Sequence, residues 1–105
     1  MRAGRLNHKI TIEQVTESRT GSGAVQEAWS TFATVWASIE PLNGREYFQA
    51  QQETATVTTR IRIRYLAGVT PKMRVKYGSR IFDIESVIDV NERHRELVLM
   101  CKERV

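Results

Sequence analysis

The sequence is short of cysteine and of hydrophobic runs, and each shortage excludes a class of protein. Its one cysteine, Cys101, excludes an internal disulfide framework and is typical of a reducing compartment. That residue lies in the apolar run ELVLMC, which predicts a buried, unreactive thiol. The start MRAGRLNHKITI has no apolar signal core, and no stretch approaches the roughly 18 apolar residues of a membrane span. We therefore expect an intracellular, soluble protein.

Motifs that indicate catalysis or metal binding are also missing. His8 and His94 stand alone among charged residues, without the Cys and His spacing of a zinc site. The sequence has no GxSxG, no HExxH and no phosphate-binding glycine loop, since TGSG at 20–23 lacks a following GK[ST]. Asp83 and Glu85 share the outward face of an expected strand, where solvation or ion pairing explains them without a metal. We expect no enzyme, cofactor or metal.

Charge is mixed rather than extreme. The 105 residues include 16 Lys and Arg against 12 Asp and Glu, for a formal net charge of +4. This balance permits contact with nucleic acid but does not demand it. The length predicts one domain, residues 1–105, with a modest core that needs no disulfide or metal support.

Alternation of apolar and polar residues recurs along the chain and predicts β-strands, because successive side chains of a strand point opposite ways. The expected strands are 8–15, 29–41, 54–65, 73–77, 80–88 and 97–103. Gly78 and Ser79 join two of them, and glycine supplies the positive φ that a two-residue type II′ turn needs first. The pattern predicts a mainly β fold, a small antiparallel β-barrel or sandwich.

Two segments interrupt the alternation. Residues 16–28, TESRTGSGAVQEA, are rich in Gly, Ser and Thr and predict a long mobile loop, either idle or ordered on assembly. Residues 45–52 follow the turn signal Asn43-Gly44 and favour a short helix. The candidate contacts are Arg19, Thr20, Gly21, Ser22 and Gly23 in the loop and Arg45, Tyr47 and Phe48 in the helix.

Trp36 lies in the middle of the expected strand 29–41, and both faces of that strand carry apolar residues. A strand that is apolar on both faces predicts a central position, so we expect Trp36 in the core. In the strand 54–65, one face carries Val57, Ile61, Ile63 and Tyr65, and we expect these side chains to point inward.

The opposite face of that strand carries a stripe of arginines, Arg60, Arg62 and Arg64, spaced roughly 7 Å apart. One interpretation is a solvated face whose charges discourage aggregation. A second is pairing with the acidic face of a neighbouring subunit, for example Asp83, Glu85 or Glu92. A third is a channel lining that touches DNA phosphates without reading sequence. The stripe alone does not decide between them.

Four blocks, VWASI, GRE, RIRY and YxxRxFxI, occur in this order between residues 35 and 84, within a pattern that starts at RAGRLNHKITIEQ, ends at LVLMCKE and covers nearly the whole chain. The combination resembles the phage head-tail adaptor, or head closure (head-tail joining), family of tailed bacteriophages and prophages. The resemblance implies a small β-barrel and a structural protein of the virion neck. Such a protein forms a ring between the portal-adaptor side of the capsid and the tail, around the channel for packaged double-stranded DNA.

The resemblance also implies the partners. They are other copies of the chain in a twelve-fold or six-fold ring, the portal-adaptor ring, a tail protein and the DNA, with no membrane. The expected location is the virion neck, and the host cytoplasm during assembly. The alternative function is a basic β-barrel whose main activity is nucleic-acid binding, although no aromatic residue lies between the arginines to stack on bases.

Overall fold

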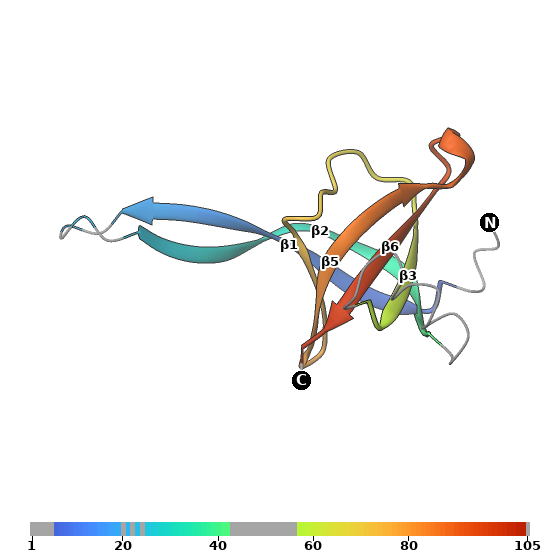
Figure 1. Cartoon of the computed structure of the whole chain (residues 1–105), viewed down its shortest axis with the longest axis horizontal. Coiled ribbons are helices and arrows are strands. Elements are labelled where there is room, and N and C mark those ends of the chain that lie inside the picture. The colour runs from blue at the N-terminus through green and yellow to red at the C-terminus, as the bar shows by residue number, and fades with distance from the viewer. Residues whose placement is uncertain (1–5, 20, 22, 24, 43–56, 105) are drawn as a thin grey trace.

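The fold is a closed antiparallel β-barrel from which a two-stranded arm projects (Figure 1). The computed structural model describes residues 6–19, 21, 23, 25–42 and 57–104. Its elements are β1 (His8–Arg19), β2 (Val25–Pro41), β3 (Thr59–Arg64), β4 (Arg74–Tyr77), β5 (Arg80–Asp89), the 3₁₀ helix η2 (Val90–Glu92) and β6 (Glu96–Glu103). Around the barrel the strands run β1-β2-β3-β6-β5-β4, and β4 pairs with β1 to close it.

The core lies inside the barrel, where alternate residues of every strand meet. Its largest fully buried side chains are Ile10, Ile12, Val57, Ile61, Ile63, Val75, Phe82, Leu99 and Cys101. Burial raises the pKa of the Cys101 thiol, as expected for an unreactive cysteine. The predicted mainly β fold and the inward face of Val57, Ile61 and Ile63 are confirmed.

The predicted turn between β4 and β5 is confirmed as well. Gly78 has a φ of +60°, and Ser79 is not among the described residues with positive φ. A positive φ confined to the first central residue is what a type II′ turn requires.

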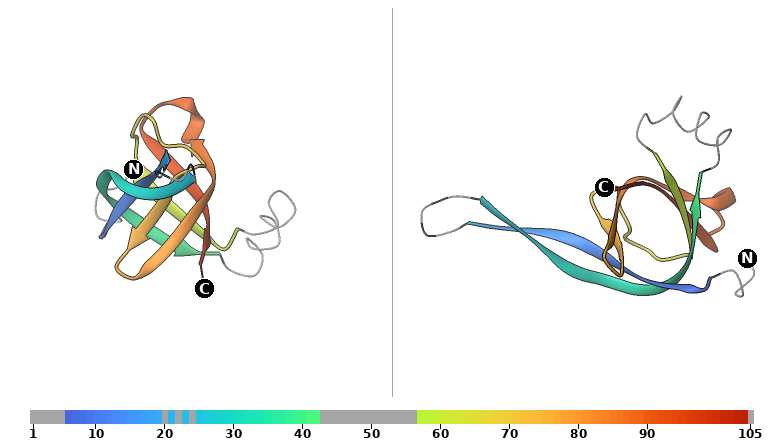
Figure 2. Two further views of the ribbon diagram at one scale, coloured as in Figure 1. Left: turned by 90° about the vertical axis from the view of Figure 1, so that its left-hand side faces the viewer. Right: turned by 90° about the horizontal axis from the view of Figure 1, so that it is seen from below.

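The predicted loop at 16–28 is wrong. β1 continues to Arg19 and β2 starts at Val25, so the two strands form one long antiparallel hairpin (Figures 1 and 2). Its register runs from His8 opposite Ala37 to Arg19 opposite Val25. The polar residues on both sides of the glycines pair with each other, because pairing satisfies their backbone N–H and C=O groups. We call the part beyond the barrel, 14–19 and 25–30, the arm.

The predicted core positions of two residues are also wrong. Trp36 is 55% exposed and Tyr65 is 39% exposed. A closed barrel has one interior, which β2 fills with Ala37, so the neighbouring Trp36 points outward. Tyr65 follows the last residue of β3, so the inward and outward alternation of side chains in that strand no longer determines where Tyr65 points.

Other expectations fall on parts of the chain that are not described. The predicted helix at 45–52, with Arg45, Tyr47 and Phe48, lies outside the described residues, and so do residues 54–56 of the expected strand. Within the described ranges, no helix is long and apolar enough to cross a membrane.

Replacing Phe82 by Ala removes a side chain with no exposed area, so we expect a loss of about 3–5 kcal/mol in the free energy of unfolding. Replacing Trp36 by Ala is the matched control, with an expected change of about 1 kcal/mol or less because that ring is 55% exposed. Urea denaturation of both variants measures the difference. Equal losses would contradict this assignment of the core.

Candidate functional site

The arginine stripe holds an ionic cluster on the outer face of the barrel, formed by Glu40 of β2, Arg60 and Arg62 of β3, and Glu96 of β6. Glu40 accepts hydrogen bonds from Arg60 Nη2 at 3.1 Å and from Arg62 Nε at 3.0 Å. Arg62 Nη1 also donates to Glu96 at 2.9 Å. The formal charges of the four side chains cancel within one chain.

The electrostatics of the cluster follow from these contacts. Burial would raise the pKa of Glu40, but hydrogen bonds from Arg60 and Ser38 outweigh it and hold the pKa below its ordinary value. The hydrogen bond to Glu96 raises the pKa of Arg62. The cluster therefore holds β2, β3 and β6 together while it leaves little net positive charge.

The acidic residues that the sequence suggests as partners of the stripe on a neighbouring subunit lie away from the stripe of their own chain. Asp83 accepts two hydrogen bonds from Arg104, each of 2.8 Å, on another side of the barrel. Glu85 and Glu92 are exposed. Among the described residues, no group of three or more His, Cys, Asp or Glu side chains could hold a metal ion.

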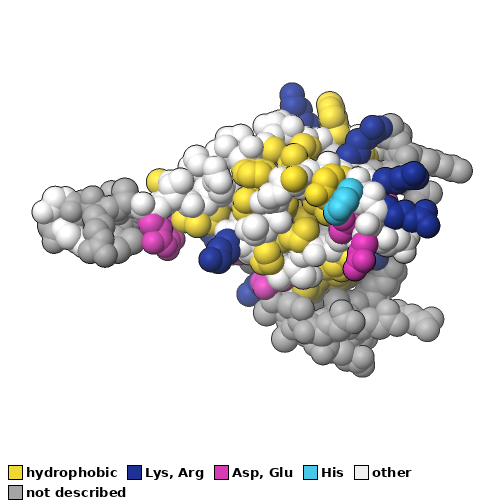
Figure 3. Space-filling view, turned by 90° about the horizontal axis from the view of Figure 1, so that it is seen from above, with side chains coloured by type: hydrophobic (Ala, Val, Ile, Leu, Met, Phe, Trp, Pro, Cys, Tyr) yellow, Lys and Arg dark blue, Asp and Glu magenta, His cyan; other side chains and the backbone are white. Residues whose placement is uncertain are grey.

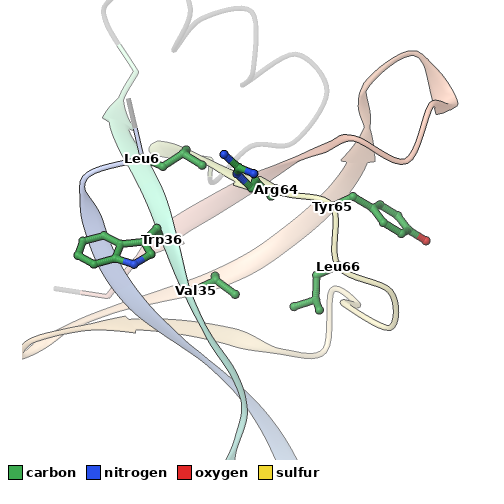
Figure 4. Close-up of a pocket in the computed structure, with 6 residues that line it drawn as sticks. All are labelled: Leu6, Val35, Trp36, Arg64, Tyr65 and Leu66. Atoms are coloured by element: carbon green, nitrogen blue, oxygen red, sulfur yellow. The ribbon is translucent and has the colours of Figure 1, made fainter. Parts of the chain in front are cut away.

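The third arginine of the stripe, Arg64, belongs to a different environment. It is exposed and, within the described part of the chain, makes no ion pair. It lines a surface hollow of about 550 Å³ whose other lining residues are Leu6, Val35, Trp36, Tyr65 and Leu66 (Figure 4). We call this the hollow. A single cation beside five largely apolar side chains suits a ligand or partner that carries an acidic group next to apolar surface.

The rim of the hollow is fixed by the segment after η2. The Tyr65 backbone N–H donates to the carbonyl of Arg95 at 3.0 Å, and the Tyr65 ring lies 4.6 Å from the ring of His94. His94 in turn pairs with Asp89, so it is not the isolated histidine that the sequence indicates. The sequence-based predictions did not include the hollow. The signal that could have found it is the position of Trp36 in its strand, because the alternation of side chains places Trp36 on the outer face of a closed barrel.

The arm leaves the barrel at a joint formed by Glu13, Arg74 and Trp29. Arg74 Nε donates to Glu13 at 2.8 Å, and both side chains are only 14% exposed. The guanidinium carbon of Arg74 lies 4.0 Å from the centre of the Trp29 ring, which is a cation–π contact. This joint packs one strand of the barrel against both strands of the hairpin where the arm begins.

Beyond the joint the arm is polar. Glu17 lies directly opposite Glu27 in the hairpin register, and both are exposed. Of the predicted loop contacts, Gly21 and Gly23 lie in the exposed turn and Arg19 ends β1. The side chain of Arg19, together with Thr20 and Ser22, lies outside what is described. The structure therefore places the arm and the arginine stripe on different parts of the molecule.

These features define a class of protein, namely a small closed β-barrel with an exposed hollow and a projecting arm. Residues 1–104 match the family model of the phage head completion protein, and the chain belongs to that family. It is a structural protein of phage head completion, and the predicted head-tail joining family is thereby confirmed.

The relatives agree with this assignment. The chain is 27% identical to head completion protein gp7 of Enterobacteria phage HK97, over 97% of this chain and 96% of the relative. It is 31% identical to head completion protein gp16 of Bacillus phage SPP1, over 69% of this chain and 66% of the relative.

Solved structures share the fold. The solution structure of protein SF1141 from Shigella flexneri 2a has a TM-score of 0.79 and 30% identity, covering 98% of this chain and 96% of that one. A chain in the virion of a native gene transfer agent particle has a TM-score of 0.65 and 22% identity, covering 96% of this chain and 97% of that one. The second likeness concerns the fold alone.

Replacing Glu40 by Gln removes the carboxylate that two arginines share. In the folded chain the pKa of Glu40 lies below its ordinary value of 4.5, so its ionised form stabilises the fold above that value. This contribution is lost as pH falls through the lower, folded pKa. We expect the variant to melt below the wild type near neutral pH and the gap to close on acidification.

Thermal unfolding from about pH 7 to about pH 3 measures this difference. Glu92→Gln is the control, because it removes an exposed carboxylate outside the ionic cluster. A gap between wild type and Glu40→Gln that stays constant with pH would contradict the assignment.

Proposed function

We propose that the chain is a subunit of the neck ring that joins the DNA-filled capsid, on its portal-adaptor side, to the tail. The ring surrounds the channel for packaged DNA, and its subunits catalyse no reaction. Membership of the head completion family supports this proposal. The structural observation that carries it is the arm, which is anchored at the Glu13–Arg74–Trp29 joint and reaches beyond the barrel (Figure 2).

A projecting arm suits a ring because ring subunits contact each other heterologously, with different surfaces on their two sides. The partners in this proposal are further copies of the chain in a twelve-fold or six-fold ring, the portal-adaptor ring, a tail protein and the DNA. The location is the virion neck, reached from the host cytoplasm. In dilute solution the chain is a monomer or weak oligomer that closes into a ring on docking to a preformed ring.

The arginine stripe counts against nucleic-acid binding as the main activity. Glu40 and Glu96 already neutralise Arg60 and Arg62, so few cations are available to phosphates on that face. We expect the isolated chain to bind duplex DNA with a dissociation constant above about 1 µM at physiological salt. A salt titration followed by fluorescence anisotropy measures this. Submicromolar, sequence-independent binding under those conditions would favour the alternative function.

The arm supplies the test of the neck-ring role. Val15 and Trp29 are paired across the hairpin, so replacing 16–28 by Asn-Gly would close the two strands with a two-residue turn. We expect the barrel to keep its melting temperature, because the core contains none of the removed residues. Particles assembled with this variant should contain heads that are not joined to tails.

The control for this experiment is Gly21→Ala, since an added Cβ there meets nothing within 4 Å. Electron microscopy of particles made with each variant gives the fraction of heads that carry tails. Normal joining by the shortened chain would show that the arm is idle.

A further inference from the structure

We propose that the arm of one copy lies across the hollow of the next copy, with Glu17 and Glu27 facing Arg64. This contact rests on the proposed ring and specifies its subunit interface. It is an interaction between two copies of this chain, formed by an acidic hairpin on one side and a basic, apolar surface on the other.

The arm has the features of a segment that lacks its partner. Beyond Glu13 the described part of β1 pairs only with β2, and an isolated two-stranded hairpin is marginally stable in water. Glu17 and Glu27 lie directly opposite each other, an arrangement that destabilises a hairpin. Neither carboxylate makes an ion pair with a described residue. A cation supplied by another molecule would offset this repulsion.

The hollow offers the matching chemistry. Arg64 lines it and makes no ion pair within the described ranges. On the face in Figure 3, acidic side chains lie on the arm beside its tip, and the opposite end carries several Lys and Arg side chains together with some Asp and Glu. Trp36 and Tyr65 add exposed aromatic surface, which is enriched where proteins associate. Glu17 and Glu27 of the arm are therefore complementary in charge to Arg64 of the hollow.

The contact must join two copies, because the same strands carry both surfaces. Trp36, which lines the hollow, pairs with Lys9 of β1. Lys9 lies eight residues before Glu17 on the same continuous strand. At about 3.3 Å per residue this separates them by about 26 Å, so the arm cannot fold back onto its own hollow. An arm at one end and a hollow at the other make a head-to-tail contact, which repeats from copy to copy and closes when the rotation permits.

Cross-linking between two differently marked full-length chains tests this interface. One chain carries Glu27→Cys in the arm and the other carries Tyr65→Cys in the hollow, and both are mixed at high concentration with a short bismaleimide. The control pair replaces Tyr65→Cys by Lys102→Cys. Lys102 is exposed and lies in β6, six residues beyond Glu96, and Glu96 is the residue that pairs with Arg64 of the hollow. We expect the hollow pair to cross-link at least about tenfold faster, because docking raises the effective concentration of the two thiols. The native Cys101 is buried.

Charge reversal shows whether the proposed ion pairs guide the contact. Adding Arg64→Glu to the hollow chain should lower the cross-linking rate to that of the control pair, and adding Glu17→Lys to the arm chain should restore it. If Tyr65→Cys lowers the melting temperature, Trp36→Cys reports on the same hollow from an exposed position.

Equal rates for the hollow and control pairs would overturn the proposal, and so would dominant linkage between two Glu27→Cys arms. A rate that does not respond to Arg64→Glu would also overturn it. Cross-linking scores the contact and particle morphology scores the neck-ring role, so the two proposals can fail separately.

Discussion

A short ladder between β1 and β4 closes the barrel, and the rest of the structure depends on it. It joins Thr11, Ile12 and Glu13 to Lys76, Val75 and Arg74, whereas β1 and β2 pair over the whole of β1. Without it the sheet would have two open edges, which promote aggregation. Its last pair contains the Glu13–Arg74 ion pair, over which Trp29 packs. The same contact therefore closes the core and fixes where the arm begins.

The charges of the chain fall into two groups with different roles. Ion pairs on the barrel wall satisfy one group, and these pairs are Glu13–Arg74, Glu40–Arg60, Glu40–Arg62, Arg62–Glu96, Asp83–Arg104 and Arg80–Glu103. The second group includes Glu17, Glu27 and Arg64, which make no such pair among the described residues. An exposed ion pair such as Arg80–Glu103 contributes only about 0–1 kcal/mol to stability, whereas the Glu13–Arg74 pair is only 14% exposed.

The sequence predicted those elements whose local pattern matches the final environment. The alternation of Ile61 and Ile63 with arginines marks a strand, and Gly78 marks a turn, wherever the strand lies in the fold. The sequence pattern does not predict the arm, because a two-stranded ribbon encloses no core and therefore needs no alternation of apolar and polar residues. The sequence does not predict that Trp36 is exposed, because this depends on closure of the sheet. A closed barrel has a single interior, and closure depends on three residues of β1 pairing with β4. The arginines were recognised, but their partners lie 20 to 34 residues away and follow from topology.

The proposed interface, made from exposed charges and a modest hollow, would let a chain that is monomeric alone become ordered in the proposed ring. Each ion pair is weak in water because solvent screens it and two long side chains lose freedom. In the proposed assembly, a preformed ring would hold neighbouring subunits side by side, which would raise the effective concentration of each arm at the next hollow. In the proposed ring the same weak contact would be made many times around a closed circle, and no subunit would be left with an unpaired arm. The proposed contact would thereby direct assembly to the surface of the preformed ring, because it would gain its strength only there.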